Sequence, residues 1–135
     1  EVAAAPPVGA PVVLELAAEP LDVVGLAPVI RNKTTHRAHY DRLRDLAGPG
    51  VFDVICHTGA ERTECCLGNL AVELDGQWFT PPASAGLLPG TFRAELLASG
   101  RITERRLEVG DLARAGGIAF LNSVRGWCPA TLAGR

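Results

Sequence analysis

Methionine is absent from the 135 residues, and lysine occurs only once, at position 33. Without methionine the sequence does not begin at an initiation codon, so we expect it to be part of a longer polypeptide. Thirteen basic residues minus this one lysine leave twelve arginines. A single lysine in such a background hints at a task that arginine cannot perform, such as chemistry that needs an amine able to lose its proton.

Long apolar runs and a strong net charge are also missing. No apolar segment approaches the ~20 residues that a membrane-spanning helix needs, and residues 1–18 lack the basic start of a signal peptide. The net charge is −2 and the isoelectric point is about 5.9, so nothing calls for nucleic acid or an acidic membrane as a partner. We therefore expect a cytoplasmic protein that binds neither.

Metal-binding patterns are missing as well. The four cysteines (Cys56, Cys65, Cys66 and Cys128) show no CxxC spacing, and the three histidines do not cluster with them. The sequence therefore predicts no zinc site and favours reduced, buried thiols. It also contains no GxSxG, P-loop or GxGxxG motif.

The length and the composition fit one folded domain. Hydrophobic residues make up 47% of the chain and charged residues 21%, which is an ordinary globular balance. Residues 1–10 are rich in alanine and proline and are predicted to be an extended linking segment, followed by a domain over residues 11–135.

Hydrophobic periodicity and turn residues predict a mixed α/β order of elements. We expect strands at 12–16, 51–56, 62–66, 70–74, 77–80, 102–107 and 117–122, and helices at 36–47, 90–99 and 111–115. Thr34 and Thr35 are expected to cap the first helix, and Asp111 the third. The residues Asp75-Gly76 are expected to form a hairpin turn. Tyr40, Leu43 and either Leu46 or Ala47 would form the apolar face of the first helix. Several hairpins are expected, so the predicted fold is a largely antiparallel sheet or pseudo-barrel with flanking helices rather than a regular βαβ winding.

Lys33 lies between an apolar stretch and the first turn of the first predicted helix. The free N–H groups of a helix start carry partial positive charge, which together with partial burial favours the neutral amine. A neutral amine is what Schiff-base chemistry requires. An ordinary solvated lysine at a helix start would produce the same pattern.

Glu64 lies in the short predicted strand RTECC. A carboxylate buried there would be costly unless it were paired, and a protonated pyridine nitrogen would suit it as a partner. A glutamate at a strand end that points to solvent is the alternative.

The segment Leu87–Arg93, which leads into the second predicted helix, is a candidate phosphate-binding site, called the phosphate seat below. Free N–H groups and the helix dipole attract anions at such a start. Gly90 would allow close approach, and the hydroxyls of Thr91 and Ser123 could donate to the phosphate. Arg125 could bind a substrate carboxylate through both of its terminal nitrogens. Taken singly, none of these residues distinguishes a site from an ordinary helix start or turn.

In combination, four ordered segments resemble the fold-type IV pyridoxal-phosphate enzymes: the branched-chain aminotransferases, the D-amino-acid aminotransferases and the aminodeoxychorismate lyases. The segments are NKTTHRAHYD, TECCLGNLAVELDGQWFTPP, GLLPGTFR and FLNSVRGWCPA. The resemblance covers residues from about 18 to 129 and corresponds to the C-terminal, cofactor-carrying domain of that family. KTTHRA, TECC and NSVRGW look most similar to aminodeoxychorismate lyase, including the form fused behind aminodeoxychorismate synthase component I.

The resemblance implies a role for each matching position. Lys33 would hold pyridoxal phosphate as a Schiff base and then move protons. Glu64 would pair with the pyridinium nitrogen, and Leu88 would pack on the face of the ring.

The phosphate contacts are also implied by the resemblance. The backbone N–H groups of Thr91 and Phe92, next to Gly90 at the helix start, would hold the phosphate, and Ser123 would touch it as well. Arg125 has no fixed role across the family, so a substrate role for it is our own hypothesis.

The implied reaction converts 4-amino-4-deoxychorismate to p-aminobenzoate and pyruvate, a step of folate biosynthesis. A class IV aminotransferase of D- or branched-chain amino acids is the alternative enzyme, and a non-catalytic domain fragment is the alternative from another class. Aminotransferases of this family usually carry a tyrosine where this chain has Ala38, with Tyr40 two residues further on.

The resemblance also implies partners for the chain. Family members have a smaller N-terminal domain that contributes an arginine to the phosphate and part of the substrate pocket, and that domain is missing from this sequence. The family's active site lies between the two domains and near a dimer interface. We therefore expect a homodimer, and a chain whose site is incomplete by itself.

Overall fold

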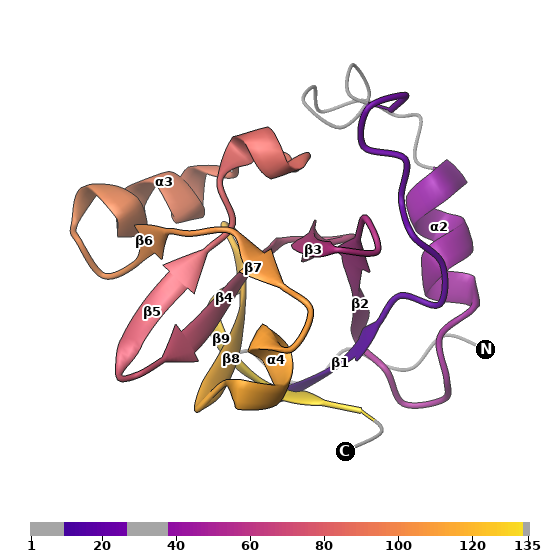
Figure 1. The fold of residues 1–135 in the computed structure, drawn as a ribbon. Coiled ribbons are helices and arrows are strands. Elements are labelled where there is room, and N and C mark those ends of the chain that lie inside the picture. Colours follow the sequence, from indigo (N-terminus) through magenta and orange to yellow (C-terminus); the bar gives the residue numbers. More distant parts are fainter. Residues whose placement is uncertain (1–9, 27–37, 134–135) are drawn as a thin grey trace.

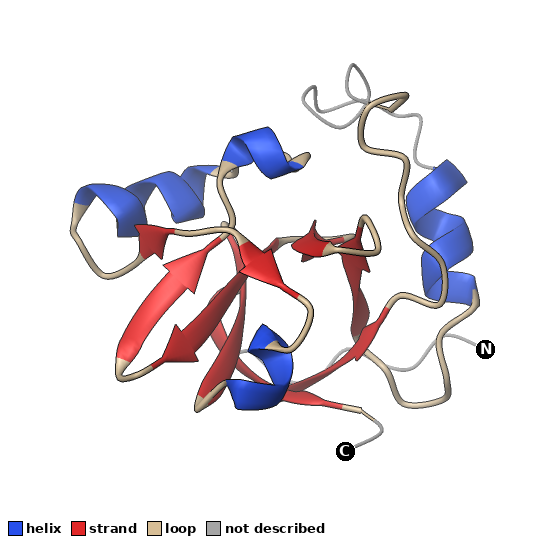
Figure 2. Ribbon diagram, viewed as in Figure 1, coloured by secondary structure: helices blue, strands red, loops and turns tan. Residues whose placement is uncertain are grey.

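The computed structural model describes residues 10–26 and 38–133, which fold into one curled sheet with helices on its outside (Figures 1 and 2). The strands are β1 (Val12–Leu16), β2 (Asp53–His57), β3 (Glu61–Cys65), β4 (Asn69–Leu74), β5 (Gln77–Thr80), β6 (Thr103–Glu104), β7 (Leu107–Glu108), β8 (Gly117–Asn122) and β9 (Gly126–Leu132). The helices are α2 (Ala38–Asp45), α3 (Thr91–Ala98), α4 (Asp111–Arg114) and the short 3₁₀-helix η1 (Ala83–Ala85).

The nine strands form one sheet in the order β6-β5-β4-β8-β9-β1-β2-β3-β7. Four strands separate β4 from β3 in this order, which in a flat sheet would place them about 24 Å apart. The connection between them, residues 66–68, spans at most about 15 Å. The sheet must therefore curl, as Figure 1 shows, and the curl brings β3 and β4 together as in the expected pseudo-barrel.

Most strand pairs are antiparallel, as predicted. Five pairs are antiparallel, and the three parallel ones are β1 with β2, β1 with β9, and β5 with β6. The Asp75-Gly76 turn joins β4 to β5, and both residues have a positive φ (53° and 81°). Positive φ at both central residues is what a tight type I′ hairpin turn requires.

Three apolar clusters hold the sheet and its helices together. The largest fills the inside of the curl and includes Leu14, Ile55 and Phe120. A second joins α2 to β2 through side chains such as Leu43 and Val54, and a third lies between α3 and the strands β4 and β8. The packing fixes α2 and α3 against different parts of the sheet, and both helices contribute to the site described below.

Several predicted elements need correction. Residues 102–107 do not form one strand: they supply β6 and β7, the first and last strands of the sheet order, with Arg105 and Arg106 between them. The strand β6 pairs with β5 and the strand β7 pairs with β3, so the segment crosses from one end of the curled sheet to the other. The strand β9 was not predicted, and β2 begins at Asp53 rather than at Val51.

The helices also differ in detail from the prediction. The helix α2 ends at Asp45, and Leu46 is 44% exposed, so Ala47 rather than Leu46 packs against the second cluster. Asp111 is the first residue of α4 and not its N-cap, which is Gly110. The expected N-cap residues Thr34 and Thr35, together with residues 36 and 37, lie outside the described residues.

Within residues 10–26 and 38–133, no helix combines the length and the apolar character needed to cross a membrane.

Candidate active site

Glu64 lies in the middle of the site, on β3, and is only 4% exposed. The hydroxyl of Tyr40 donates a hydrogen bond to its Oε2 atom at 2.8 Å, and the backbone N–H of Leu88 donates to Oε1 at 3.2 Å. Each carboxylate oxygen therefore has a protein donor. The side chain does not point to solvent, which removes the alternative interpretation of this residue.

Tyr40 reaches Glu64 from α2, where it lies on the same face as Leu43. Its ring is packed in the second apolar cluster and is 5% exposed. Burial and, after it, the nearby Glu64 raise the pKa of Tyr40 well above its ordinary value, because both oppose a second negative charge. The phenol thus keeps its proton and serves as the donor.

Asn69, the first residue of β4, fastens the loop that precedes α3. Its Nδ2 atom donates to the carbonyl of Leu88 at 2.9 Å, and its Oδ1 atom accepts from the N–H of Gly90 at 3.2 Å. A Cβ atom on Gly90 would lie 2.7 Å from that same Oδ1, closer than real contacts allow. Glycine is therefore needed at position 90 for this close approach.

The start of α3 faces the turn after β8. The hydroxyls of Thr91 and Ser123 lie 2.9 Å apart, and both residues are exposed. Gly90 is the N-cap residue and, having no side chain, places no capping group over the first turn. The N–H groups of a first helical turn have no partner within the helix, so this end of α3 offers donors to an external group.

The turn between β8 and β9 carries Ser123 and Arg125. Asn122 holds this turn from within, because its Oδ1 atom accepts from the N–H of Arg125 at 2.7 Å. The guanidinium of Arg125 lies over the ring of Phe52, 5.0 Å from its centroid. Stacking on a flat ring fixes the plane of the guanidinium.

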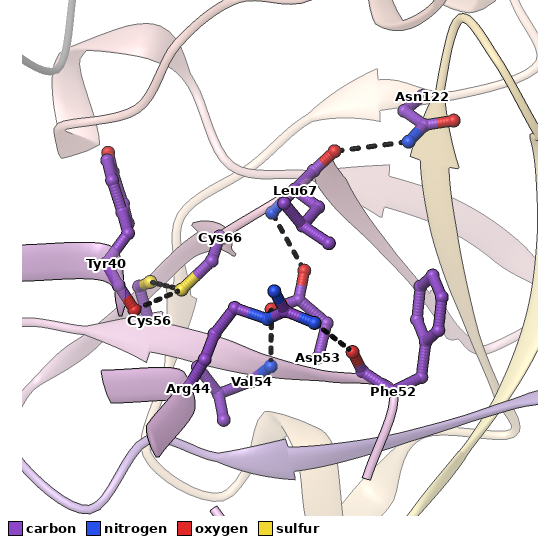
Figure 3. Close-up of polar contacts among 9 residues, drawn as sticks. All are labelled: Tyr40, Arg44, Phe52, Asp53, Val54, Cys56, Cys66, Leu67 and Asn122. Carbon is purple, nitrogen blue, oxygen red and sulfur yellow. Dashed lines mark hydrogen bonds and ion pairs between the residues drawn. The ribbon is translucent and has the colours of Figure 1, made fainter. Parts of the chain in front are cut away.

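A second set of contacts ties this turn to the turn between β3 and β4 (Figure 3). The Nδ2 atom of Asn122 donates to the carbonyl of Leu67 at 3.2 Å, and the N–H of Leu67 donates to Oδ2 of Asp53 at 2.8 Å. Asp53 is 1% exposed, and Arg44 of α2 lies beside it at 3.7 Å. Burial raises the pKa of Asp53, and the backbone donors and Arg44 oppose that shift.

The structure connects most of the predicted site residues through one chain of hydrogen bonds. Tyr40, Glu64, Leu88, Asn69 and Gly90 are joined by the hydrogen bonds described above, and these bonds end beside the pair Thr91 and Ser123. Phe92, the second residue of α3, is half-buried against the third apolar cluster. Arg125 lies two residues beyond Ser123. Lys33 lies outside the described residues.

Sequence reasoning did not assign roles to Tyr40, Asn69, Asp53 or Asn122. The partners of Tyr40 and Asn69 are 24 and about 20 residues away in the chain, so no local pattern connects them. The available signal was chemical: Asn69 and Asn122 stand at strand ends, and Asp53 is followed by three apolar residues of its strand.

The sequence and the fold are similar to those of known proteins. The family model described as amino-transferase class IV matches residues 17–133. A Schizosaccharomyces pombe protein provisionally named aminodeoxychorismate lyase is 34% identical over 113 residues, which cover 78% of this chain and 48% of that protein. The chain thus spans about half the length of this curated relative.

Two solved structures extend the comparison. A Mesorhizobium loti protein provisionally named amino-acid aminotransferase is 32% identical, with a TM-score of 0.84 over 98% of this chain and 63% of its own. A Legionella pneumophila protein provisionally named 4-amino-4-deoxychorismate lyase is 23% identical, with a TM-score of 0.83 over 92% of this chain and 48% of its own, and it supports the fold alone. The chain belongs to the class IV aminotransferase family of pyridoxal-phosphate-dependent enzymes.

Proposed function

We propose that the chain is the cofactor-carrying part of an aminodeoxychorismate lyase, which converts 4-amino-4-deoxychorismate to p-aminobenzoate and pyruvate. The observation that carries the proposal is the buried carboxylate of Glu64, held by the phenol of Tyr40 and the N–H of Leu88. The similarity to the fission yeast protein, whose name is that of the lyase, favours this activity within the family.

The residues of the site fit pyridoxal phosphate at its ring nitrogen. Two donors that fix a buried carboxylate favour its ionised form, and an ionised buried carboxylate is suited to a cationic N–H partner. In this proposal Glu64 holds a proton on the ring nitrogen, and Leu88 packs on the ring face.

The residues also fit the phosphate. The start of α3 lacks a capping side chain, and the close contact of Gly90 with Asn69 leaves no room for one. We propose that the N–H groups of Thr91 and Phe92 and the hydroxyls of Thr91 and Ser123 bind the phosphate there. The 2.9 Å separation of these hydroxyls lets both donate to one anion.

The chemistry in this proposal is divided between the cofactor and the protein. When bound, pyridoxal phosphate supplies an electron sink for the bonds that break at the substrate. The amine of Lys33 would hold the cofactor and would accept and return the protons that the loss of pyruvate requires. Formation of an aromatic product provides much of the driving force.

Arg125 is our candidate for binding a substrate carboxylate. Its guanidinium lies over the ring of Phe52, and a planar fork suits a carboxylate. We further propose that a smaller N-terminal domain completes the pocket and that the active form is a homodimer. The short span of this chain relative to its relatives is consistent with such a domain.

An aminotransferase of D- or branched-chain amino acids is the second candidate, favoured by the 32% identity to the Mesorhizobium loti protein named as an aminotransferase. The two activities separate in one assay. The purified protein with pyridoxal phosphate is given 4-amino-4-deoxychorismate, and pyruvate release is compared with keto-acid-dependent amino transfer from amino acids. Pyruvate release without an added keto acid supports the lyase. Transfer without pyruvate release would replace it by the aminotransferase, and neither activity in the homodimer with its N-terminal domain would favour a non-catalytic domain.

A further inference from the structure

The hydrogen bond between Tyr40 and Glu64 links a side chain of α2 to the carboxylate of the site. It is 2.8 Å long, and both side chains are almost fully buried, at 5% and 4% exposure. A hydrogen bond to a charged group is stronger than a neutral one, and more so where water is excluded. The contact is therefore strong enough to influence where the carboxylate lies and which form it takes.

Tyr40 is itself held firmly, so the carboxylate must adapt to the phenol and not the reverse. Its ring packs in the cluster formed by α2 and β2, with Leu43, Val54 and Cys56. Its carbonyl accepts a hydrogen bond from the thiol of Cys66 at 3.6 Å, which ties the same residue to the end of β3 (Figure 3). Because the backbone and the ring are both held, the phenolic oxygen is fixed beside the carboxylate of Glu64.

Leu88 completes the arrangement on the other oxygen. Its N–H donates to Oε1 of Glu64, and its carbonyl is held by Asn69. The position of the carboxylate is thus defined by α2 on one side and by the loop before α3 on the other. Loss of either donor would let it rotate and would make its protonation easier, because donors to the ionised form favour that form.

We propose that Tyr40 is a positioning residue, whose phenol fixes the Glu64 carboxylate in its ionised form so that it can hold the protonated ring nitrogen of the cofactor. The inference rests on the proposed function, since it assigns that role to Glu64. In this role Tyr40 acts through Glu64, to whose carboxylate its hydroxyl donates. It lies two positions beyond Ala38, the place where related aminotransferases carry a tyrosine, so it is a different position in the chain.

The pairing can be tested without any cofactor, because Tyr40 is the only tyrosine of the chain. The ultraviolet absorbance change of tyrosine ionisation therefore reports this residue alone. We expect Tyr40 to stay protonated at pH ~10, where a free tyrosine is half ionised. In Glu64→Gln the neighbouring charge is gone, and ionisation should begin at lower pH than in the wild type. Glu64→Asp, which shortens the side chain by one methylene, should also lower the pH at which Tyr40 ionises. It replaces the first variant in the experiment if Glu64→Gln does not fold. Equal titration curves for the folded wild type and variant would overturn the pairing.

The role toward the cofactor is tested with Tyr40→Phe, which keeps the ring and removes the donor. Binding of pyridoxal phosphate is followed by its absorbance across the acidic pH range. We expect binding roughly tenfold weaker or more, from the loss of a hydrogen bond to a charged group, and the acidic limb of the pH profile should move to higher pH. The sign follows because Glu64 without this donor takes up a proton more readily.

Thr63→Val is the matched control. Thr63 is the residue next to Glu64, and its hydroxyl also makes a buried hydrogen bond, to the carbonyl of Cys56 at 3.2 Å. This variant should lose stability without moving the acidic limb. If folded Tyr40→Phe keeps the wild-type limb, or if Thr63→Val moves it equally, the positioning role is overturned. If the wild type takes up no cofactor even when the N-terminal domain that completes the pocket is supplied, the proposed function fails. The role assigned to Tyr40 then fails with it, even where the tyrosine titration confirms the pairing.

Discussion

The hydroxyls of Thr91 and Ser123 meet at 2.9 Å although 32 residues separate them in the chain. One begins α3 and the other follows β8, so the contact marks the place where the helix start and the end of a central strand converge. This convergence makes the phosphate seat a specific and testable part of the proposal.

Thr91→Val and Ser123→Ala should each weaken the binding of pyridoxal phosphate by roughly tenfold, because each removes a donor to a charged group. The same variants should bind pyridoxal, which lacks the phosphate, as the wild type does. Titrations with the two ligands measure both effects. Ser99→Ala, at the other end of α3, removes a hydroxyl that contacts only the helix carbonyl of Leu96 and serves as the control. Equal losses for both ligands would place the effect away from the phosphate.

Gly90→Ala should destabilise the fold by about 1–3 kcal/mol, the usual cost of forcing an extra group into a packed site. The backbone at Gly90 has a φ of −68°, which alanine accepts, so the cost comes from the 2.7 Å approach to Asn69. Denaturant unfolding of Gly90→Ala, Asn69→Ala and the double variant measures it. With the asparagine side chain gone, the glycine replacement should cost less than it does in the wild type. Strictly additive losses would mean that the clash is not with Asn69.

The four cysteines should be unreactive in the folded protein. None of Cys56, Cys65, Cys66 and Cys128 forms a disulfide, and each is at most 5% exposed. The pKa of Cys56 is raised by its hydrogen bond with Cys66 and by burial, and that of Cys65 is raised by burial. Because the thiolate is the reactive form, a thiol reagent at pH ~7 should label little of the native protein. After denaturation all four thiols should react, and rapid labelling before it would contradict the buried positions.

Asp53 should make the stability depend on pH in a defined direction. Burial raises the pKa of this carboxyl in the folded state, whereas in the unfolded chain it ionises near its ordinary value of ~3.9. Between the two values the folded state binds more protons, so the contribution of Asp53 to stability falls as the pH rises and then levels off. Relative to wild type, Asp53→Asn should therefore gain stability with rising pH across this window.

Unfolding free energies from pH ~4 to ~7 test the dependence on Asp53. Asp45→Asn, at an exposed carboxyl near the end of α2, controls for the loss of one charge. A difference between wild type and Asp53→Asn that stays constant, or that moves in favour of the wild type as the pH rises, would contradict the expected sign.

Local patterns in the sequence predicted much of the fold because they depend on neighbours along the chain. The apolar run of residues 117–122 and the Asp75-Gly76 turn are examples, and both occur where they were expected. The strand β9 could not be predicted in the same way. It contains Pro129, which has no N–H to donate to a neighbouring strand and therefore argues against a central strand. The division of 102–107 between two edges depends on how the sheet curls, which no local pattern encodes.

The site shows the same division. Glu64, Gly90, Thr91 and Ser123 were selected from chemistry and from resemblance, and the structure places them in one line. The contacts that position them could not be foreseen, since Tyr40 and Asn69 act on residues about 20 positions away. A helix face predicts that Tyr40 is buried, but not that its hydroxyl meets a carboxylate.

Trapping of the cofactor tests the central claim most directly. The purified protein is incubated with pyridoxal phosphate, treated with borohydride to fix any bond between the cofactor aldehyde and an amine, digested and analysed by mass spectrometry. Lys33 is the only lysine of these 135 residues, so no other lysine within them competes with it. In the wild type we expect the added mass on the peptide that contains Lys33. In the Lys33→Ala variant we expect no peptide to carry it. Absence of the mass from Lys33, or its presence on the terminal amine alone, would contradict the proposal.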